Sequence, residues 1–247
     1  FQVYVSSEND AMIPLFQNDG TNVFNPAFAE PNVLIVNTEK LDELGITVEG
    51  YADLLQPELK GKIIAADPAT SPSAFQSLIG MLYGMGNGDP MSDEAWNFID
   101  EFLVNLDGKV ASSSSQVYNG VASGEYCVGL SYEDPCVELQ AAGEYPVKVV
   151  YAKEGTIFSG QSIQIVKDAP HLEAAQKFVD YVLSEKVQTA VAAELNLRPL
   201  RSGIPVNDKM IPNEDIKLFD TYSAAYIAEN KPEIVNTYLE HVEMMME

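Results

Sequence analysis

The stretch that most constrains the fold lies around residue 130, where an apolar run leads directly into a polar turn. Residues 126–130 are β-prone and apolar, a run long enough for a buried strand and too short for a helix. The turn Ser131-Tyr-Glu-Asp134 follows, and Pro135 then opens a helical segment that Asp134 is placed to cap. Open α/β sheets place their ligand sites where a strand, a polar turn and a helix N-terminus follow one another. The stretch therefore predicts an α/β fold with a candidate site at this turn.

The same order of elements occurs twice upstream. Residues 62–67 are typical of a strand, and Ser71 follows as a good N-cap with Pro72 at the first helical position. Residues 109–111 run into the serines of 112–115 and then into a short helical segment. Helix N-termini bind anions, because their first N–H groups have no partner within the helix and the helix dipole is positive there. Three such junctions predict a site for an anion.

The candidate ligand-binding residues are those of the three turns. They are Ser71, Ser73, Ala74, Ser113, Ser114, Ser115, Tyr132, Glu133 and Asp134. Any single serine or aspartate before a helix is most often an ordinary cap, and four consecutive serines can be a plain polar loop. The hypothesis of a site therefore depends on the repetition of the junction, and on an aromatic residue and two acids in one turn.

Several strings in the chain resemble one family. They are 51–63 (YADLLQPELKGKI), 67–75 (DPATSPSAF), 124–135 (GEYCVGLSYEDP), 153–156 (KEGT) and Arg198-Pro199. Together they resemble the bacterial extracellular solute-binding proteins of ABC transporters, in the group that includes ferric-ion, aminoethylphosphonate and hexose-phosphate binders. The resemblance covers nearly the whole chain in the right order. It implies a type II periplasmic-binding-protein fold, in which two lobes each contain a mostly parallel sheet flanked by helices.

The resemblance, rather than the residue pattern, also supplies the expected domains and partners. Residues 38–152 would form the second lobe, and residues 1–37 and 153–247 would be parts of the first. We expect the first lobe to be incomplete at its N-terminus, because the chain opens at Phe1 without the βαβ portion with which such proteins begin. The implied protein is a monomer without a cofactor that binds a small solute in an interlobe cleft and delivers it to the membrane permease of an ABC transporter. It would be extracytoplasmic, in the periplasm or as a cell-surface lipoprotein.

The charge balance excludes some partners. Lys and Arg number 14 against 37 Asp and Glu, which gives a formal net charge of −23. A field of this sign repels nucleic acid and anionic membrane surfaces. It does not forbid an anionic ligand, because dipoles inside a pocket can outweigh distant charges that salt screens. We therefore expect no nucleic-acid partner.

Cys127 and Cys136 are the two cysteines of the chain. We favour two buried free thiols over a disulfide. Neither His171 nor His241 is near them in sequence, so the cysteines do not predict a zinc site.

Two other functional classes have weaker support in the sequence. A serine hydrolase is disfavoured, because the chain has no Gly-x-Ser-x-Gly motif and no histidine near a serine-rich turn. The adjacent acids Glu133 and Asp134 could act as acid and base, but neighbouring residues on a turn rarely face one substrate together. A regulatory ligand-sensing domain of similar fold is the third class, and no DNA-binding segment accompanies it. We expect no enzyme activity.

The preferred ligand is an organic phosphate or phosphonate, held by the serine-lined helix ends, with Glu133 or Asp134 receiving an amine or sugar hydroxyls. The alternative is ferric iron, bound by Tyr132 and Glu133. Ferric binders of this family use two consecutive tyrosines at about this strand end, and this chain has one. Phenolate and carboxylate oxygens nevertheless suit Fe(III), so the alternative stays open.

Five further expectations concern the rest of the chain. Residues 32–37 are an unbroken apolar run, consistent with a buried parallel strand. The polar loop 153–161 and the pair Arg198 and Arg201 are candidates for a role near the cleft. A helix is predicted with a face of Leu172, Ala175, Phe178, Val179 and Val182, and two helices after residue 213, the second opened by Pro232.

Overall fold

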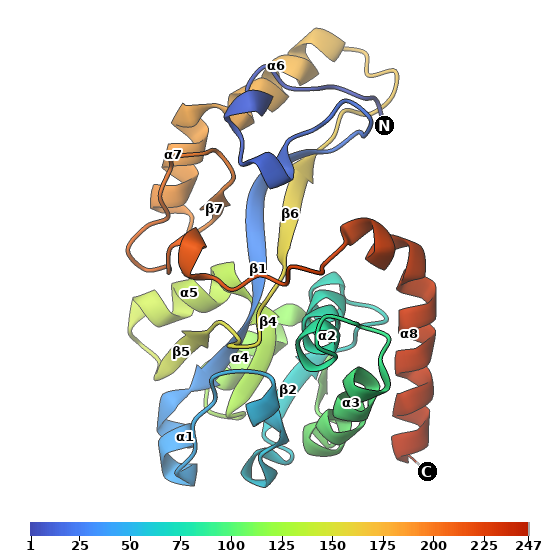
Figure 1. Cartoon of the computed structure of the whole chain (residues 1–247). Coiled ribbons are helices and arrows are strands. Elements are labelled where there is room, and N and C mark those ends of the chain that lie inside the picture. Colours follow the sequence, from blue (N-terminus) through green and yellow to red (C-terminus); the bar gives the residue numbers. More distant parts are fainter. Residues whose placement is uncertain (247) are drawn as a thin grey trace. The chain divides into compact units, whose positions relative to one another are not determined.

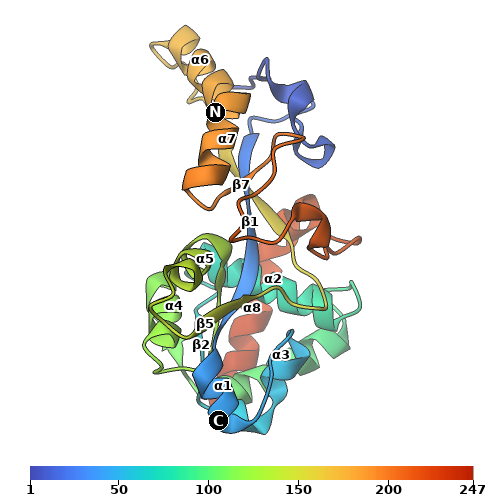
Figure 2. The same cartoon turned by 90° about the vertical axis from the view of Figure 1, so that its left-hand side faces the viewer.

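The chain folds into two compact units in the computed structural model, which describes residues 1–246 and the side chains of residues 1–245. Unit 1 consists of Phe1–Glu30 and Phe158–Asp215, and unit 2 of Pro31–Ile157 and Ile216–Glu247. Figures 1 and 2 show the course of the chain through both units. The sequence-based division placed the whole C-terminal part, 153–247, in the first lobe. The structure instead assigns the last segment to unit 2, because Ile227, Ile234 and Tyr238 lie in the core of that unit.

Unit 2 is built on a five-stranded sheet flanked by helices. Its elements are β1 (Asn25–Asn37, from residue 31), α1 (Thr38–Leu44), β2 (Ile63–Ala66), α2 (Pro72–Met85), α3 (Asp93–Leu106), β3 (Val110–Ala111), α4 (Ser114–Ala122), β4 (Val128–Tyr132), α5 (Glu133–Ala142), β5 (Val147–Val150) and α8 (Ala224–Met246). Two short 3-10 helices, Ala52–Leu55 and Pro57–Leu59, precede β2.

The sheet of unit 2 is mixed. Its strand order is β3-β2-β4-β1-β5. Strand β2 is parallel to both β3 and β4, whereas β1 is antiparallel to β4 and β5, with Leu34 opposite Leu130 and Val150. The apolar run 32–37 is therefore a buried strand, as expected, but not a parallel one. Burial on both faces produces such a run in either direction, so the pattern reports burial and not strand direction.

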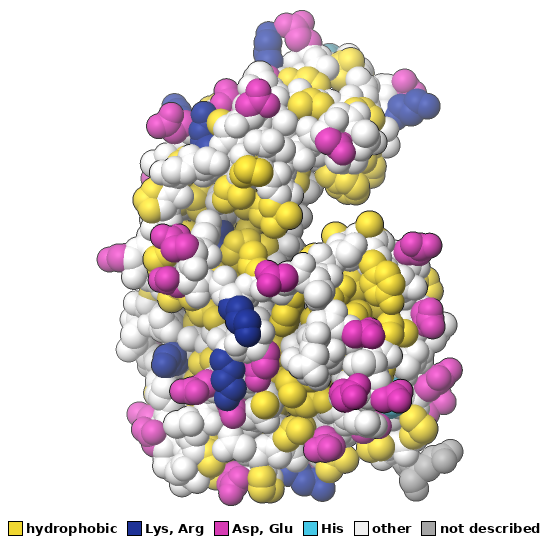
Figure 3. All heavy atoms as spheres, in the orientation of Figure 1, with side chains coloured by type: hydrophobic (Ala, Val, Ile, Leu, Met, Phe, Trp, Pro, Cys, Tyr) yellow, Lys and Arg dark blue, Asp and Glu magenta, His cyan; other side chains and the backbone are white. Residues whose placement is uncertain are grey.

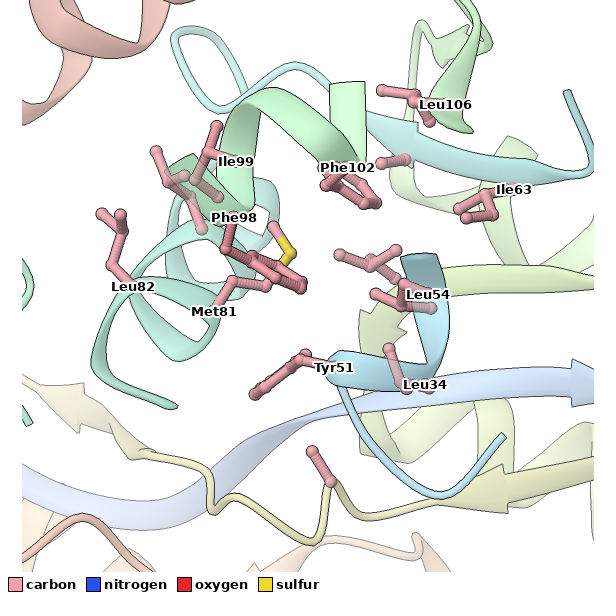
Figure 4. Packing of buried hydrophobic residues seen from close by; sticks show 14 of the residues in the cluster. Leu34, Tyr51, Leu54, Ile63, Met81, Leu82, Phe98, Ile99, Phe102 and Leu106 are labelled. Carbon is pink, nitrogen blue, oxygen red and sulfur yellow. The ribbon is translucent and has the colours of Figure 1, made fainter. Parts of the chain in front are cut away.

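The core of unit 2 lies between the sheet, α2, α3 and α8. Figure 4 shows part of it, including Tyr51, Leu54, Ile63 and Phe98. Leu54, Ile63 and Ile99 have no exposed surface. Burying a side chain of this size contributes about 1.5–3 kcal/mol. Ser71 caps α2, as expected, and Ser92 caps α3, whose first turn contains two acids.

Helix α8 differs from the prediction of two helices after residue 213. It runs without interruption through Pro232, and Figure 1 shows a bend in its first part. A proline inside a helix removes one hydrogen bond and bends the helix, but packing can compensate. Here α8 packs against α3, where His241 Nδ1 lies 2.5 Å from Asp100 Oδ1 and the His241 ring stacks on Trp96 at 5.0 Å.

Unit 1 is smaller. Residues 25–30 of β1 pair in it with β6 (Phe158–Ile163) and with β7 (Arg198–Pro199), and α6 (Leu172–Leu183) and α7 (Glu185–Glu194) accompany them. Its 3-10 helices are Asn9–Ala11, Pro14–Phe16 and Asn213–Asp215. The core contains Met12, Ala27, Ala29, Ile165, Val179, Leu183 and Leu200.

The predicted apolar face of α6 is correct in part. Val179 and Leu183 are 1% exposed, but Phe178 is 60% exposed. Successive helical residues are about 100° apart, so the neighbour of a fully buried residue lies at the edge of the apolar stripe. Phe178 occupies that edge.

The two arginines predicted as candidates near a cleft have structural contacts within unit 1. Arg198 has no exposed surface, and its Nη1 donates to the Ile211 carbonyl (2.9 Å) and to Asn213 Oδ1 (2.7 Å). Arg201 Nη1 pairs with Glu8 Oε2 at 2.6 Å. Arg198 thus fixes the segment that follows β7, and Arg201 fixes the N-terminal segment.

The surface reflects the composition. Acidic side chains are spread over the face drawn in Figure 3, in keeping with the net charge of −23. Among residues 1–246, no helix combines the length and the apolar composition that a membrane crossing requires.

Candidate functional site

The first part of the site is the N-terminus of α2, which follows β2. Ser71 caps this helix, since its Oγ accepts a hydrogen bond from the Ala74 N–H at 3.4 Å, and Pro72 occupies the first helical position. Ser71 and Ser73 are half-buried, and their hydroxyl oxygens are 3.1 Å apart. The side chain of Ala74 is buried, so this residue can offer a ligand only its backbone.

The N-terminus of α4 forms the second part. Ser113 caps this helix by accepting from the Gln116 N–H at 3.3 Å, and Ser115 Oγ lies 3.0 Å from Ser113 Oγ. Ser113 and Ser115 are exposed, whereas Ser114 is half-buried. A side chain at Gly129 of β4 would lie only 2.8 Å from Val117 Cγ1, so glycine is needed for α4 to pack this closely on the sheet.

The two serine turns meet. Ser73 Oγ lies 2.8 Å from Ser114 Oγ, which joins the first residues of α2 to the first residue of α4. The sheet explains this contact: β2 and β3 are parallel neighbours, with Ala66 opposite Ala111, so the turns that follow them leave the sheet side by side. Both serine segments lie at helix N-termini, as expected, and this contact brings them together. That they face a common cleft stays a prediction.

The third junction lies between β4 and α5, on the other side of β2. Here the predicted cap is wrong: α5 begins at Glu133, its N-cap residue is Tyr132, and no side chain caps it. Asp134 therefore lies in the first turn, with Pro135 as the third helical residue. Proline is tolerated there because the N–H groups of the first turn have no partner within the helix.

Tyr132 lies half-buried at the end of β4. Its ring makes an edge contact with Tyr118 of α4, with the centroids 6.5 Å apart. The contact places the aromatic residue of the third turn against the helix that begins at Ser114. Tyr118 was not predicted as a site residue, because it lies inside a helix and away from any motif.

The two acids of α5 have different environments. Glu133 is 2% exposed, and its carboxylate accepts a hydrogen bond from the hydroxyl of Tyr151, which follows β5. Asp134 is half-buried, and its pKa is raised by burial and further by the negative charges of Glu138 and Glu133. Adjacent helical residues point about 100° apart, so the two carboxylates do not act as one pair.

Asn32, the first residue of the apolar run in β1, contacts both the start of α2 and the end of β4, and it was not predicted as a site residue. Its side-chain amide donates to the Ser73 carbonyl and to Ser77 Oγ, both at 3.1 Å. The same amide donates to the Ser131 carbonyl at 3.3 Å. Thr156 Oγ1 in turn donates to the Asn32 carbonyl at 2.9 Å. A buried amide with this many partners fixes the start of α2 relative to the end of β4.

Residues 153–156 of the loop predicted to face a cleft contact the segment around residues 51–53. Glu154 accepts hydrogen bonds from the N–H groups of Tyr51 (2.9 Å) and Ala52 (3.1 Å). Lys153 Nζ pairs with Asp53 Oδ2 at 2.9 Å. Gly50 has no room for a side chain beside the Glu154 carboxylate. Two of the family-like strings, 51–63 and 153–156, therefore hold each other.

Both cysteines are free and buried, as expected. Burial raises the pKa of the Cys136 thiol to about 12, so it is protonated at neutral pH and unreactive. In the part of the chain that the structure describes, no three His, Cys, Asp or Glu side chains come together as a metal-binding group.

Comparison with known proteins places the chain among binding proteins. Residues 2–230 match the family described as "Bacterial extracellular solute-binding protein". The spermidine/putrescine-binding periplasmic protein of Escherichia coli (strain K12) is 31% identical over 185 residues, which are 71% of this chain and 51% of that protein. Iron uptake protein A1 of Synechocystis sp. is 29% identical over 168 residues, which are 64% of this chain and 45% of that protein. The chain thus spans about half the length of the curated relatives it matches.

Solved structures share the fold. The periplasmic binding protein AfuA from Actinobacillus pleuropneumoniae, determined with fructose-6-phosphate, aligns with a TM-score of 0.83 at 24% identity, over 98% of this chain and 76% of that one. Iron-bound HitA from Pseudomonas aeruginosa aligns with a TM-score of 0.75 at 20% identity, over 97% and 76%. These likenesses confirm the expected fold of the type II periplasmic binding proteins.

Proposed function

Because the chain belongs to the bacterial extracellular solute-binding protein family, we propose that it acts in the solute-binding component of an ABC importer. The solute is a small molecule that carries an oxyanion, such as an organic phosphate or phosphonate. The component delivers this solute to a membrane permease and works outside the cytoplasm. The relatives whose names state a ligand are transport-associated, which supports a binding role rather than an enzyme.

The observation that carries the choice of ligand is the contact between Ser73 and Ser114. It brings two helix N-termini together, each with N–H groups that have no partner within its helix. Neither α2 nor α4 has an acidic residue in its first turn, so no side chain of these two turns complements the positive end of its own helix dipole. Hydroxyl and N–H donors at two such ends suit the oxygens of a phosphate or phosphonate.

A cation also lies near this position. Lys231 Nζ of α8 is 4.7 Å from the centroid of the Phe75 ring, and Phe75 is the fourth residue of α2. A positive charge beside a side chain of the first turns of α2 adds to the favourable potential for an anion. This local potential supports an anionic solute despite the net charge of −23.

The N-terminus of α5 has another role in this proposal. Its first turn contains Glu133 and Asp134, whose charges already complement the helix dipole. Tyr132 contributes its ring or its hydroxyl to the solute, and Asp134 receives an amine or hydroxyl group. Glu133 holds Tyr151 and so shapes the wall of the site.

Ferric iron is the second candidate. It is favoured by Tyr132 beside two carboxylates, and a relative is named as an iron uptake protein. In the iron hypothesis Tyr132 binds as a phenolate together with Glu133. Against it, Glu133 is buried and hydrogen-bonded to Tyr151.

Catalysis by the serines lacks a base. His241 is held by Asp100, and His171 is the N-cap residue of α6 in unit 1. We expect no turnover of ester, amide or phosphate substrates. A hydrolytic activity that disappears on Ser73→Ala or Ser114→Ala would contradict the proposal.

Native mass spectrometry of the protein as purified tests the ligand class. The expected result is an added mass of an organic phosphate or phosphonate, which is lost on Ser73→Ala. Retention of a polyamine or of iron, with no phosphorus compound bound on subsequent addition, would contradict the proposed ligand.

A further inference from the structure

Unit 2 contains a second hollow, which the proposed function does not use. It is a groove of about 590 Å³ between the C-terminal half of α3, the edge strand β3 and α8. Leu103, Leu106, Val242 and Met245 are among the apolar side chains that line it. Figure 1 shows α3 and α8 beside each other in this unit, and Leu106, labelled in Figure 4, is the last residue of α3. The volume lies in the range of small-molecule sites, which are typically about 300–1,000 Å³ and mostly apolar.

The charged groups of the groove favour a cation. Asp67 and Asp107 line it together with Lys60 as its one basic residue. Asp67 uses only one carboxylate oxygen in the described structure, which accepts the Ala69 N–H at 2.8 Å. Neither aspartate is paired with a lysine or arginine within residues 1–245. Asp67 is half-buried beside the apolar walls, so its charge is screened less by solvent than that of the exposed Asp107.

Tyr238 of α8 adds a polar group to the groove wall. The residue is 6% exposed, yet its hydroxyl has no hydrogen-bond partner among the described residues. Burial and the charge of Asp67 raise its pKa to about 12, so the phenol stays protonated and available as a donor or acceptor. The Tyr238 hydroxyl and the Asp67 carboxylate together provide the few polar groups that orient a ligand in an apolar binding site.

We propose that this groove binds a small apolar molecule that carries one positive charge, such as an arylalkylammonium ion. The apolar body contacts the side chains of α3 and α8, and the ammonium group lies between Asp67 and the Tyr238 hydroxyl. This groove is separate from the contact between Ser73 and Ser114, although Asp67 lies in the turn that precedes α2.

The test uses the full chain and three probes of matched size: 4-phenylbutylammonium, 4-phenylbutanol and 4-phenylbutyrate. Isothermal titration calorimetry should show saturable binding of the ammonium ion at one site per chain, at least tenfold tighter than binding of the carboxylate. The alcohol should bind with intermediate affinity. Absence of saturable binding of the ammonium ion, or equal affinity for the carboxylate, would overturn the proposal.

Variants locate the site. Leu239→Lys places a positive charge in the groove at a residue that is 40% exposed, and it should weaken ammonium binding at least tenfold. Leu195→Lys, at a leucine 55% exposed in unit 1, is the matched control and should change nothing. Asp67→Asn should weaken binding of the ammonium ion several-fold and leave binding of the alcohol unchanged.

If Leu239→Lys lowers the melting temperature, Val104→Lys replaces it, since Val104 lines the same groove and is 47% exposed. Binding that persists unchanged in a folded lysine variant of the groove would contradict the assignment. Competition by an organic phosphate in wild type would likewise contradict the separation of the two sites.

Discussion

The helix ends at the serine turns and the helix end at Glu133 arise from the same order of strand, turn and helix, yet they differ in charge. The first turns of α2 and α4 contain no acid, and their hydroxyls meet where Ser73 contacts Ser114. The first turn of α5 contains two acids, one of them buried against Tyr151. A helix dipole that is already complemented by its own side chains offers little to an external anion. The comparison shows that the order of elements locates a site, whereas the first-turn residues decide what it binds.

The largest expected loss of stability follows from replacing Asn32, whose side-chain amide bonds both the start of α2 and the end of β4. Asn32→Ala deletes hydrogen bonds to Ser73, Ser77 and Ser131. Leaving buried polar groups unpaired costs about 1–3 kcal/mol each, so we expect a loss of at least about 2 kcal/mol in the free energy of unfolding. Urea unfolding followed by circular dichroism measures it. Asn97→Ala, at an exposed position of α3, is the control and should change stability by less than about 0.5 kcal/mol; equal effects of the two variants would show that Asn32 does not join the turns.

Ser73→Ala tests the helix ends of α2 and α4, whose first turns contain no acid. It removes a hydroxyl from the contact between α2 and α4, and the affinity for an organic phosphate should fall by about 1.5–3 kcal/mol, as for a hydrogen bond to a charged group. Ser123→Ala, whose hydroxyl bonds the Gly120 carbonyl at the other end of α4, is the matched control for calorimetry. A phosphate affinity that survives Ser73→Ala unchanged would remove the serine turns from the site.

Lys231→Gln tests the cation beside α2. Because Lys231 is exposed and lies beside Phe75 of α2, the loss of its charge should weaken the binding of a phosphate ligand by about 0.2–1 kcal/mol. The difference between wild type and variant should shrink as salt rises from low to physiological concentration. Lys186→Gln, on α7 of unit 1, serves as the control. A salt-independent difference would indicate a packing effect on Phe75 instead of an electrostatic one.

Asp134→Asn tests the first turn of α5, which contains two acids, and should give the smallest change in stability. Burial raises the pKa of Asp134 above its ordinary value of 3.8, so the folded state binds the proton more tightly than the unfolded state does. Its contribution to the free energy of unfolding therefore falls as pH rises through the interval between 3.8 and the raised pKa, and remains lowered at neutral pH. The variant should be slightly more stable than wild type at pH 7 and lose that advantage below pH 3.8.

Asp93→Asn provides the contrast for this experiment. Asp93 is an exposed acid in the first turn of α3, and its replacement removes a favourable interaction with the helix dipole. It should lower stability at pH 7. Thermal denaturation of both variants across pH measures whether each one stabilises or destabilises the protein. A stabilising effect of both would contradict the role of burial at Asp134.

Local signals in the sequence predicted the parts of the site that depend on neighbouring residues. The cap Ser71 and a strand around residue 130 follow from such signals. The structure confirms both, with the strand at Val128–Tyr132 instead of 126–130. The cap at Asp134 was wrong, because Pro135 fits more than one position in a first turn and the sequence does not choose among them.

Contacts between distant residues could not be predicted in the same way. Asn32 and Thr156 are far apart in the chain and bond each other in the fold, and Tyr151 meets Glu133 only because β5 and α5 pack together. The placement of α8 in unit 2 likewise depends on which core its apolar face meets. The amphipathic pattern of a helix shows that it has a partner and not which one.

The most direct test of the central claim is a titration of wild type and Tyr132→Phe with ferric citrate and with a panel of organic phosphates and phosphonates, following visible absorbance and melting temperature together. The account predicts a melting-temperature rise with at least one phosphorus compound, no visible band, and a loss of about 0.5–3 kcal/mol in binding on Tyr132→Phe, as for one hydrogen bond. A coloured, stoichiometric ferric complex that Tyr132→Phe abolishes, with no response to any phosphorus compound, would contradict it.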